Sequence, residues 1–236
     1  MSFIPGCILA KRAASPTVTL LDLSIPSLTF APGQWLDFCI PTADWIGGFS
    51  IASGPAADET IQIAVKESTH PPAHWVTHDS QVGDTVIVKV GGTCLLHSEQ
   101  HAHPAIMIAG GIGISPVLGL YRQHVIEKRP PVKLYYSVST EEEVVFRNEL
   151  EQLIRPNDHL TITLTQSNTW NQQQQSPPNN IDYQVGRTMT AFLNDTLLPD
   201  NAIYYVCGPP SMQDEALETL RSHDVAPDRL VYEKWW

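Results

Sequence analysis

Two glycine-rich turns are the stretches of this sequence best suited to bind phosphate. GGIGISP at 110–116 follows the apolar run AIMIA at 105–109 and opens a helix. Glycines in such a turn let the backbone approach a pyrophosphate, whose charge is stabilised by the free N–H groups of the helix N-terminus. CGPPSM at 207–212 also follows an apolar strand. Because parallel strands end at one edge of their sheet, the two turns together predict a dinucleotide site.

The first turn has a second interpretation. Its pattern, G-G-x-G-x-x-P, departs from the G-x-G-x-x-G fingerprint in the last position, where Pro116 suits the first turn of a helix. A tight strand-to-helix turn without a ligand is therefore the alternative.

Composition excludes several classes of partner. The chain has 236 residues, 42% of them hydrophobic, with 19 Pro and 14 Gly, which indicates a globular protein rich in loops. A formal charge of −11 argues against nucleic acid and anionic membrane as partners. No apolar run approaches the roughly 18 residues of a membrane span.

Cysteine spacing indicates a reducing compartment. The start of the chain lacks the apolar core and cleavage pattern of a secretory signal. Cys7, Cys39, Cys94 and Cys207 lie far apart and form no C-x-x-C pair, so neither a disulfide framework nor a cysteine-held cluster is expected. We expect a cytoplasmic protein.

Histidines raise the question of a metal. His70, His74 and His78 are spaced four apart, a spacing at which helical imidazoles can share an ion. Pro71 and Pro72 place His70 outside the helix, and HSEQH at 97–101 is not the H-E-x-x-H pattern. No metal site is predicted.

The pattern of expected secondary structure changes near residue 100. Before it, short strand-like runs occur at 17–25, 34–40, 60–66 and 85–90, and a helical turn is expected at 71–79. After the polar stretch 97–104, strands at 105–109, 132–138, 160–167 and 202–208 alternate with helices at 116–128, 141–154, 188–195 and 211–223. The Gln- and Asn-rich stretch 167–180 is expected to be a surface loop. We predict a β-barrel domain at 1–98 and a doubly wound α/β domain at 104–236.

Five motifs carry a resemblance to a known family. A β-barrel followed by GGIGISP, CGPPSM and a C-terminal glutamate with aromatic residues resembles the ferredoxin–NADP reductase superfamily in the order and spacing of its elements. More closely, GGFSI, HPPAHWV, GGIGISP, CGPPSM and the terminal YEKWW resemble the oxidoreductase NAD-binding-domain-containing family. The resemblance implies an antiparallel Greek-key barrel that binds flavin, followed by a parallel-sheet domain that binds NAD(P).

The resemblance also implies a redox centre. Ser50 would approach the reactive nitrogen of the flavin, Phe49 would pack on the cofactor, and Glu233 and Cys207 would line the centre as catalytic residues. Trp235 would cover the exposed face of the flavin, with Trp236 just beyond. The alternative for this pair is that it seals a hydrophobic core.

Two departures weaken the expected hold on the flavin phosphates. Gly47 stands where the superfamily has an arginine, and Ala73 stands where it has a serine. Backbone N–H groups at the start of the helix near 71, with Lys66, His70 or His74, could replace them. The predicted cofactor-binding set is Gly48, Phe49, Ser50, Ile51, Lys66, His70, Ala73, His74, Trp75, Trp235, Trp236, Gly110, Gly111, Ile112, Gly113, Ile114, Ser115, Pro116, Ser137, Ser167, Arg187, Cys207, Gly208, Pro209 and Met212.

The resemblance therefore predicts a flavin-dependent oxidoreductase, in which a hydride passes from NAD(P)H to FAD and electrons pass to an unidentified acceptor, such as a separate redox protein. NADH is slightly favoured, because Ser167 is followed by Asn168 without the adjacent arginine of NADP-dependent relatives. The alternative is a relative of the same fold with weak or lost flavin binding that acts as a nucleotide- or partner-binding module.

Overall fold

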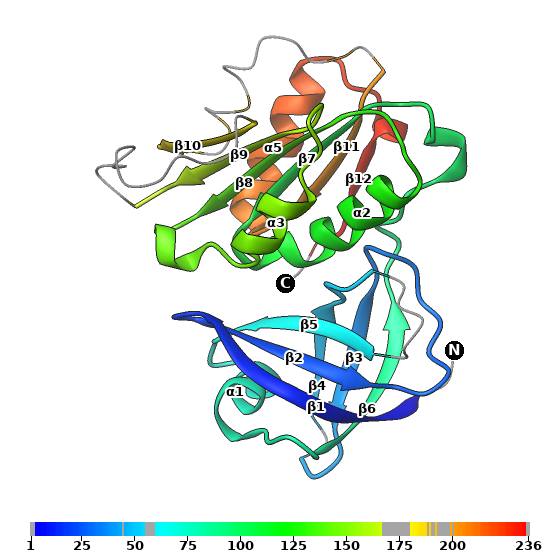
Figure 1. The fold of residues 1–236 in the computed structure, drawn as a ribbon, viewed down its shortest axis with the longest axis vertical. Helices are drawn as coiled ribbons and strands as arrows, with labels where there is room; N and C mark the ends of the chain where they lie inside the picture. Colours follow the sequence, from blue (N-terminus) through cyan, green and yellow to red (C-terminus); the bar gives the residue numbers. More distant parts are fainter. Residues whose placement is uncertain are drawn as a thin grey trace.

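The computed structural model describes residues 3–43, 45–54, 60–166, 180–187, 189, 192, 199 and 201–234. Two six-stranded sheets form the two halves of the molecule, the N-terminal sheet below and the C-terminal sheet above in Figure 1. Among these residues, no helix has both the length and the apolar character needed to cross a bilayer.

The N-terminal sheet is a closed antiparallel Greek-key barrel. Its strands are β1 (Ile4–Ser15), β2 (Val18–Ser24), β3 (Trp35–Ile40), β4 (Trp45–Ser50), β5 (Thr60–Lys66) and β6 (Thr85–Gly91), in the order β4-β3-β6-β1-β2-β5. Its two edges meet where Ile51, after β4, pairs with Ile63 of β5. Next to that pair, the Ala52 N–H donates to the Gln62 carbonyl at 2.8 Å. Closure leaves fewer unpaired strand edges.

Alternation along β3 divides its side chains between the barrel core and the outside. Leu36, Phe38 and Ile40 are fully buried inside the barrel. Trp35 and Asp37 lie on the other face, as the two-residue period of a strand requires, and so they are available to line a site. Ser50 of β4 pairs with Trp35.

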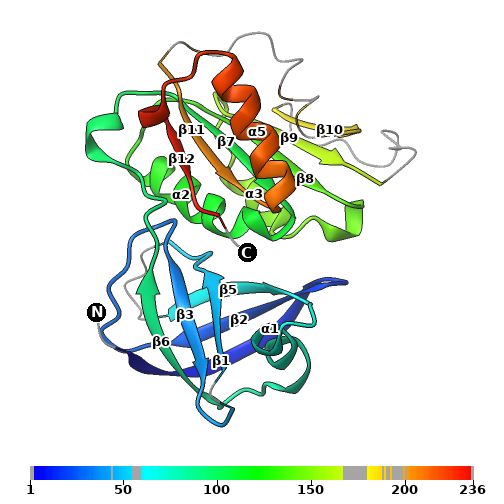
Figure 2. The ribbon, with the colours of Figure 1, turned by 180° about the vertical axis from the view of Figure 1, so that it is seen from behind.

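The C-terminal sheet is parallel and covered on both faces. Its strands are β7 (Ala105–Gly110), β8 (Val132–Val138), β9 (His159–Leu164), β10 (Ile181–Val185), β11 (Ile203–Cys207) and β12 (Leu230–Tyr232), in the order β10-β9-β8-β7-β11-β12. Helices α2 (Ile114–Ile126) and α3 (Arg147–Leu153) cover one face and α5 (Pro210–Ser222) the other, as Figures 1 and 2 show. Every residue of β7 is buried, which explains its unbroken apolar run. The predicted doubly wound fold is confirmed.

Short helical turns complete the chain: α1 (Pro71–His74) with the π-helical turn η1 (Trp75–Asp79), and the 3₁₀ turns η2 (Ser98–Gln100), η3 (Gly111–Gly113), η4 (Glu141–Glu143) and η5 (Pro227–Arg229).

Three element predictions differ from the structure. The helix expected at 141–154 is interrupted, because Phe146 has a left-handed backbone with φ of 62°, which leaves η4 and then α3. The strand expected to reach residue 167 ends at Leu164, and β10 was not predicted. The expected helix at 188–195 and loop at 167–180 lie mostly outside the described residues.

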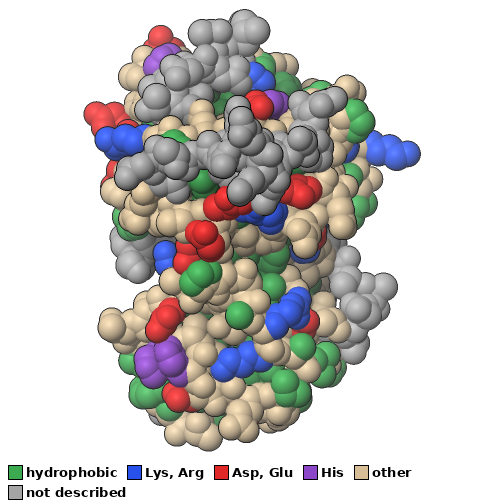
Figure 3. Space-filling model, turned by 60° about the vertical axis from the view of Figure 1, so that its left-hand side comes forward, with side chains coloured by type: hydrophobic (Ala, Val, Ile, Leu, Met, Phe, Trp, Pro, Cys, Tyr) green, Lys and Arg blue, Asp and Glu red, His purple; other side chains and the backbone are tan. Residues whose placement is uncertain are grey.

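The two halves are joined by polar and apolar contacts. Glu143, beside α3, accepts hydrogen bonds from the hydroxyls of Ser15 and Thr17, both at 2.8 Å. Arg122 on α2 donates to the Ala52 carbonyl and pairs with Glu149. Barrel residues Val18, Leu20 and Ala64 belong to the same apolar core as the C-terminal helices. Lysine, arginine and carboxylate side chains are interspersed over the face seen in Figure 3.

Candidate active site

The two glycine-rich turns are packed directly against each other. A Cβ on Gly113 would lie 2.3 Å from the Cys207 carbonyl oxygen, and one on Gly208 would lie 3.0 Å from the Gly110 nitrogen. A Cβ on Gly110 would lie 2.5 Å from the Met212 sulfur. Packing within the protein is therefore sufficient to explain these three glycines.

Gly111 and Ser115 need another explanation. Gly111 has φ of +52°, and a Cβ there would have no atom within 4 Å, so the backbone borders open space. The Ser115 side chain is 1% exposed, and its Oγ has no hydrogen-bond partner among the described residues. An orphaned buried hydroxyl is costly. Both residues line the same cavity, so a polar ligand fits this turn better than an empty one.

That cavity, of about 830 Å³, is built from both halves of the molecule. The barrel contributes Phe49 and Ser50 at the end of β4, and the parallel sheet contributes Cys207 at the end of β11. Glu233 follows β12 and lines it too. The three predicted catalytic side chains, from distant parts of the sequence, thus share one space.

Burial keeps the Cys207 thiol protonated. The residue is 4% exposed, and desolvation together with the negative charge of Glu233 raises the pKa of the thiol to about 12. Burial also raises the pKa of Cys94, with further contributions from Cys207 and Glu233. Because a thiolate is the nucleophilic form, Cys207 is suited to contact a ligand and not to attack one. All four cysteines are free thiols.

Glu233 is anchored at both its side chain and its backbone. The Thr93 N–H donates to its Oε1 at 3.4 Å, and the Gln213 side chain donates to its carbonyl oxygen at 2.8 Å. The loop after β6 and helix α5 therefore fix the carboxylate at the mouth of the cavity.

Gly47 is explained by a neighbour within the protein. A Cβ on Gly47 would lie 2.7 Å from the Pro72 Cβ and 3.2 Å from the Phe49 ring. The Phe49 ring in turn packs edge-on against Phe38, with 5.4 Å between the centroids. The position at which the resemblance implies an arginine is closed by Pro72 of α1.

The helix start at 71 offers fewer donors than expected. Its first two residues are Pro71 and Pro72, which have no N–H, and the His74 N–H donates to the His70 carbonyl at 2.9 Å. Two of the backbone N–H groups expected to replace the missing arginine and serine are therefore absent. Ala73 is the first residue of α1 that has an N–H.

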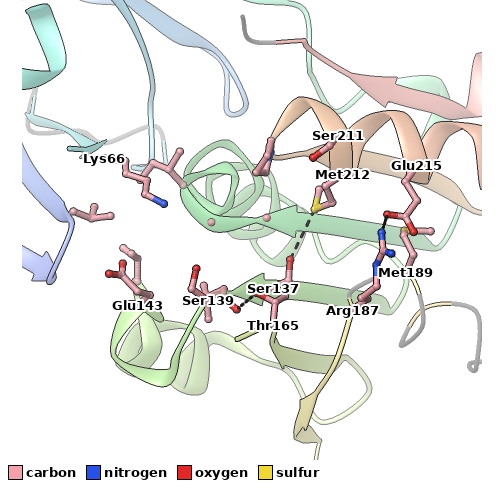
Figure 4. Close-up of a pocket in the computed structure, with 17 residues that line it drawn as sticks. Lys66, Ser137, Ser139, Glu143, Thr165, Arg187, Met189, Ser211, Met212 and Glu215 are labelled. Carbon is pink, nitrogen blue, oxygen red and sulfur yellow. Dashed lines mark hydrogen bonds and ion pairs between the residues drawn. The ribbon is translucent and has the colours of Figure 1, made fainter. Parts of the chain in front are cut away.

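A second cavity, of about 370 Å³, shares Gly110, Gly111 and Ile112 with the larger one, and Figure 4 shows the residues that line it. Lys66 reaches it from the barrel and also lines the larger cavity. Ser137 lies at the end of β8, where its hydroxyl donates to the Ala109 carbonyl at 3.4 Å. Arg187 lines the opposite wall, and its guanidinium pairs with Glu215 of α5 at 2.7 Å.

The cavities divide the predicted residues into three groups. Lining one cavity or both are Gly48, Phe49, Ser50, Lys66, His70, Ala73, Gly110, Gly111, Ile112, Gly113, Ser115, Ser137, Arg187, Cys207, Gly208, Pro209, Met212 and Glu233. Described but lining neither are Ile51, His74, Trp75, Ile114 and Pro116. Ser167, Trp235 and Trp236 lie outside the described residues.

Several lining residues were not predicted. Trp35, Asp37, Ala64 and Lys234 line the larger cavity, and Glu143 and Glu215 line the smaller one. Trp35 and Asp37 had a usable signal, because the alternation of QWLDFC places them opposite the apolar residues. Glu143 and Glu215 had no such signal in the sequence, since only the folding of the chain brings them to the cavity.

Histidine rings stack without forming a metal cluster. The His74 and His78 rings are parallel, with 4.2 Å between centroids, and His70 precedes α1. Within the described ranges, no group of three or more His, Cys, Asp or Glu residues is arranged to hold a metal.

The residues fit NAD(P) throughout and a flavin in part. The open space at Gly111 and the orphaned Ser115 hydroxyl suit a dinucleotide phosphate beside a helix N-terminus. Trp35, Ala64 and Phe49 line the cavity with apolar and aromatic surface for a flat ring, Phe49 from the core side of the β3–β4 pair and Trp35 from its other face. The described residues at the expected flavin phosphate position do not offer the donors of an arginine–serine site.

Comparisons with known proteins agree with this architecture. The family model of the oxidoreductase NAD-binding domain matches residues 107–218. Oxidoreductase NAD-binding domain-containing protein 1 of Danio rerio is 33% identical over 94% of this chain and 88% of its own length, and that of Homo sapiens is 31% identical over 97% and 78%. The reductase component of propane 2-monooxygenase from Gordonia sp. (strain TY-5) is 28% identical over 97% of this chain and 66% of its own length.

Solved structures share the whole fold. A cytochrome P450 reductase from Amycolatopsis superposes with a TM-score of 0.83 at 20% identity, over 99% of this chain and 69% of that one. A ferredoxin NADP+ reductase from Neisseria gonorrhoeae with bound FAD and NADP gives 0.80 at 21% identity, over 99% and 98%.

The fold is that of ferredoxin reductase-like proteins, and residues 107–218 match the oxidoreductase NAD-binding domain. Among proteins of this fold, the chain belongs to the family of oxidoreductase NAD-binding domain-containing protein 1. The predicted resemblance is confirmed.

Proposed function

We propose that this chain is an NAD(P)H-dependent flavin oxidoreductase that takes a hydride from NAD(P)H and passes electrons through FAD to a separate redox protein. The observation that carries the proposal is the convergence of Ser50, Cys207 and Glu233 on one cavity beside the glycine turn. A relative named as the reductase component of a monooxygenase supports a protein acceptor. Four free thiols are compatible with the reducing cytoplasm.

In this proposal each residue has a distinct task. A flavin, when bound, supplies the ability to accept a hydride and release electrons. Ser50 offers a hydroxyl to hydrogen-bond the ring, and Glu233 offers a carboxylate that holds or releases a proton. The neutral Cys207 thiol provides a packing surface for the nicotinamide, while Gly111 and Ser115 bind the pyrophosphate of the nucleotide.

We further propose that NADH is the preferred donor. A 2′-phosphate needs cationic partners. Arg187 is a cation of the smaller cavity, but Glu215 already pairs with it at 2.7 Å and brings a negative charge to the same wall. Glu143, a second carboxylate, lines that cavity too.

Steady-state oxidation of NADH tests the proposal, with ferricyanide as acceptor and each flavin added in turn. We expect flavin-dependent activity that falls at least tenfold in Ser50→Ala and in Glu233→Gln, while Ser222→Ala, on the far end of α5, behaves like the wild type. Absence of activity with every flavin and with both nucleotides would favour the alternative, a nucleotide- or partner-binding module.

A further inference from the structure

The larger cavity keeps a wall for the flavin ring but has lost the groups that would hold flavin phosphates. From this contrast we infer that the site recognises the isoalloxazine ring alone and takes flavin as an exchangeable ligand, so that riboflavin, FMN and FAD bind about equally well. This inference rests on the proposed function and defines its flavin more narrowly.

Three kinds of phosphate donor are missing together. Gly47 has no side chain, and Pro72 fills the space into which one would extend, at 2.7 Å from its Cβ position. Ala73 has no hydroxyl and is 5% exposed. Pro71 and Pro72 remove the N–H groups of the first two residues of α1. Any one of these missing donors could be compensated by the other two, but all three are missing at the same place.

The remaining charges of the cavity do not favour a phosphate either. Its described lining carries three carboxylates, Asp37, Glu67 and Glu233, against the ammonium groups of Lys66 and Lys234 and the imidazole of His70. Asp37 pairs with Lys89 at 3.5 Å and Glu67 with His78 at 3.3 Å. The Lys234 ammonium is already paired with Asp214 at 2.5 Å. Lys66 also lines the smaller cavity, where its charge is available to the nucleotide. The described side-chain charges of the cavity therefore do not replace the guanidinium that Gly47 lacks.

Aromatic side chains that a flat ring can pack on, in contrast, still line the cavity. Trp35 lies over Gly91 and Gly92, where a Cβ on either glycine would be 2.6–2.8 Å from the indole. Phe49 is held by Phe38. Fixed aromatic surfaces of this kind bind a flat ring through packing, independently of the length of its tail.

The test is calorimetric titration of the full chain with riboflavin, FMN and FAD, with NADH titrated separately. We expect the three flavin dissociation constants to agree within about threefold. An FAD or FMN constant more than tenfold below that of riboflavin would overturn the inference and leave the proposed function intact. Binding of NADH with no binding of any flavin would overturn both.

A variant pair sharpens the test. In Gly47→Arg/Pro72→Gly the space is opened and the arginine is restored. FMN and FAD should then bind about tenfold more tightly, as one charge-assisted hydrogen bond implies, with riboflavin unchanged. Pro72→Gly alone is the matched control: it opens the space and restores one backbone N–H without the guanidinium, so FMN and FAD should bind less tightly to it than to the double variant, with riboflavin unchanged. An equal gain for riboflavin would contradict phosphate recognition, and the wild-type titration decides the matter if the double variant does not fold.

Discussion

Gly111 and Gly113 stand two residues apart in one turn and have opposite surroundings. A Cβ at Gly113 would meet the Cys207 backbone at 2.3 Å, whereas one at Gly111 would meet nothing within 4 Å. Gly113→Ala should therefore lower the free energy of unfolding by about 3 kcal/mol through overpacking. Gly111→Ala should lower it by about 1 kcal/mol, from the left-handed backbone.

The variants at Gly111 and Gly113 also distinguish an effect on stability from an effect on nucleotide binding. Gly111→Ala should weaken NADH binding about tenfold, because its methyl group occupies the space that a phosphate would approach. Urea titrations and calorimetry measure the two effects. Normal NADH affinity in Gly111→Ala would remove the glycine turn from the proposed nucleotide site.

Glu215 is the residue by which the nucleotide preference can be tested. Glu215→Gln removes the carboxylate that pairs with Arg187. Because Arg187 is 74% exposed, water screens its charge, and the gain should be small. We expect the ratio of NADPH to NADH affinity to rise about threefold, and Arg187→Gln/Glu215→Gln to reverse the gain. An equal change for both nucleotides would contradict this role.

At the scale of elements, helix α2 connects the barrel to the parallel sheet. Arg122 donates to the Ala52 carbonyl, beside the strand pair that closes the barrel, and also pairs with Glu149. Arg122→Ala would leave a buried carbonyl without this donor and should lower the free energy of unfolding by about 2 kcal/mol. Glu149→Gln, which keeps the contact to Ala52, should cost less than about 1 kcal/mol. Equal losses in urea titrations would show that the contact between the halves contributes nothing.

Helices and strands with a strong local sequence pattern were predicted correctly, whereas those with a weak pattern were not. The strand predicted at 132–138 matches β8, because an almost unbroken apolar run, with six of its seven residues buried, leaves no ambiguity. The helix at 141–154 failed because the left-handed Phe146 has no marker such as glycine in the sequence. β10 was missed because five residues beside a polar stretch carry little signal, and its pairing with β9 supplies the missing information.

The site was predictable only in part, for a related reason. Glycines and strand ends are local features, and so the nucleotide turn could be found from the sequence. The contact of Pro72 with Gly47 joins residues of different elements, and no periodicity reports it. It is nevertheless this contact that decides how a flavin is held.

At the scale of the whole molecule, a buried histidine links stability to pH. His124 on α2 is 1% exposed, and its Nε2 lies 2.6 Å from the Pro130 carbonyl oxygen. Burial, aided by the charges of Arg155 and Arg129 and opposed by the Pro130 carbonyl and Asp158, lowers its pKa to about 4. In the unfolded chain, His124 therefore binds a proton near pH 6.5, whereas in the folded chain it stays neutral until the pH approaches 4.

The sign of the effect follows from that difference. The contribution of neutral His124 is complete above about pH 6.5 and is lost as the pH falls toward 4, by on the order of 3 kcal/mol. His124→Gln keeps a neutral donor that does not titrate, and its free energy of unfolding should fall less steeply between these pH values. Identical slopes for variant and wild type in urea titrations would contradict the assignment.

The measurement that tests the central claim most directly is the visible spectrum of the chain with saturating FAD, mixed anaerobically with NADH. The account predicts that the flavin bands bleach at a rate far above that of free FAD and NADH at the same concentrations, and that NADPH acts more slowly. A spectrum that NADH and NADPH leave unchanged, with FAD bound, would contradict the claim that the two ligands meet in one cavity.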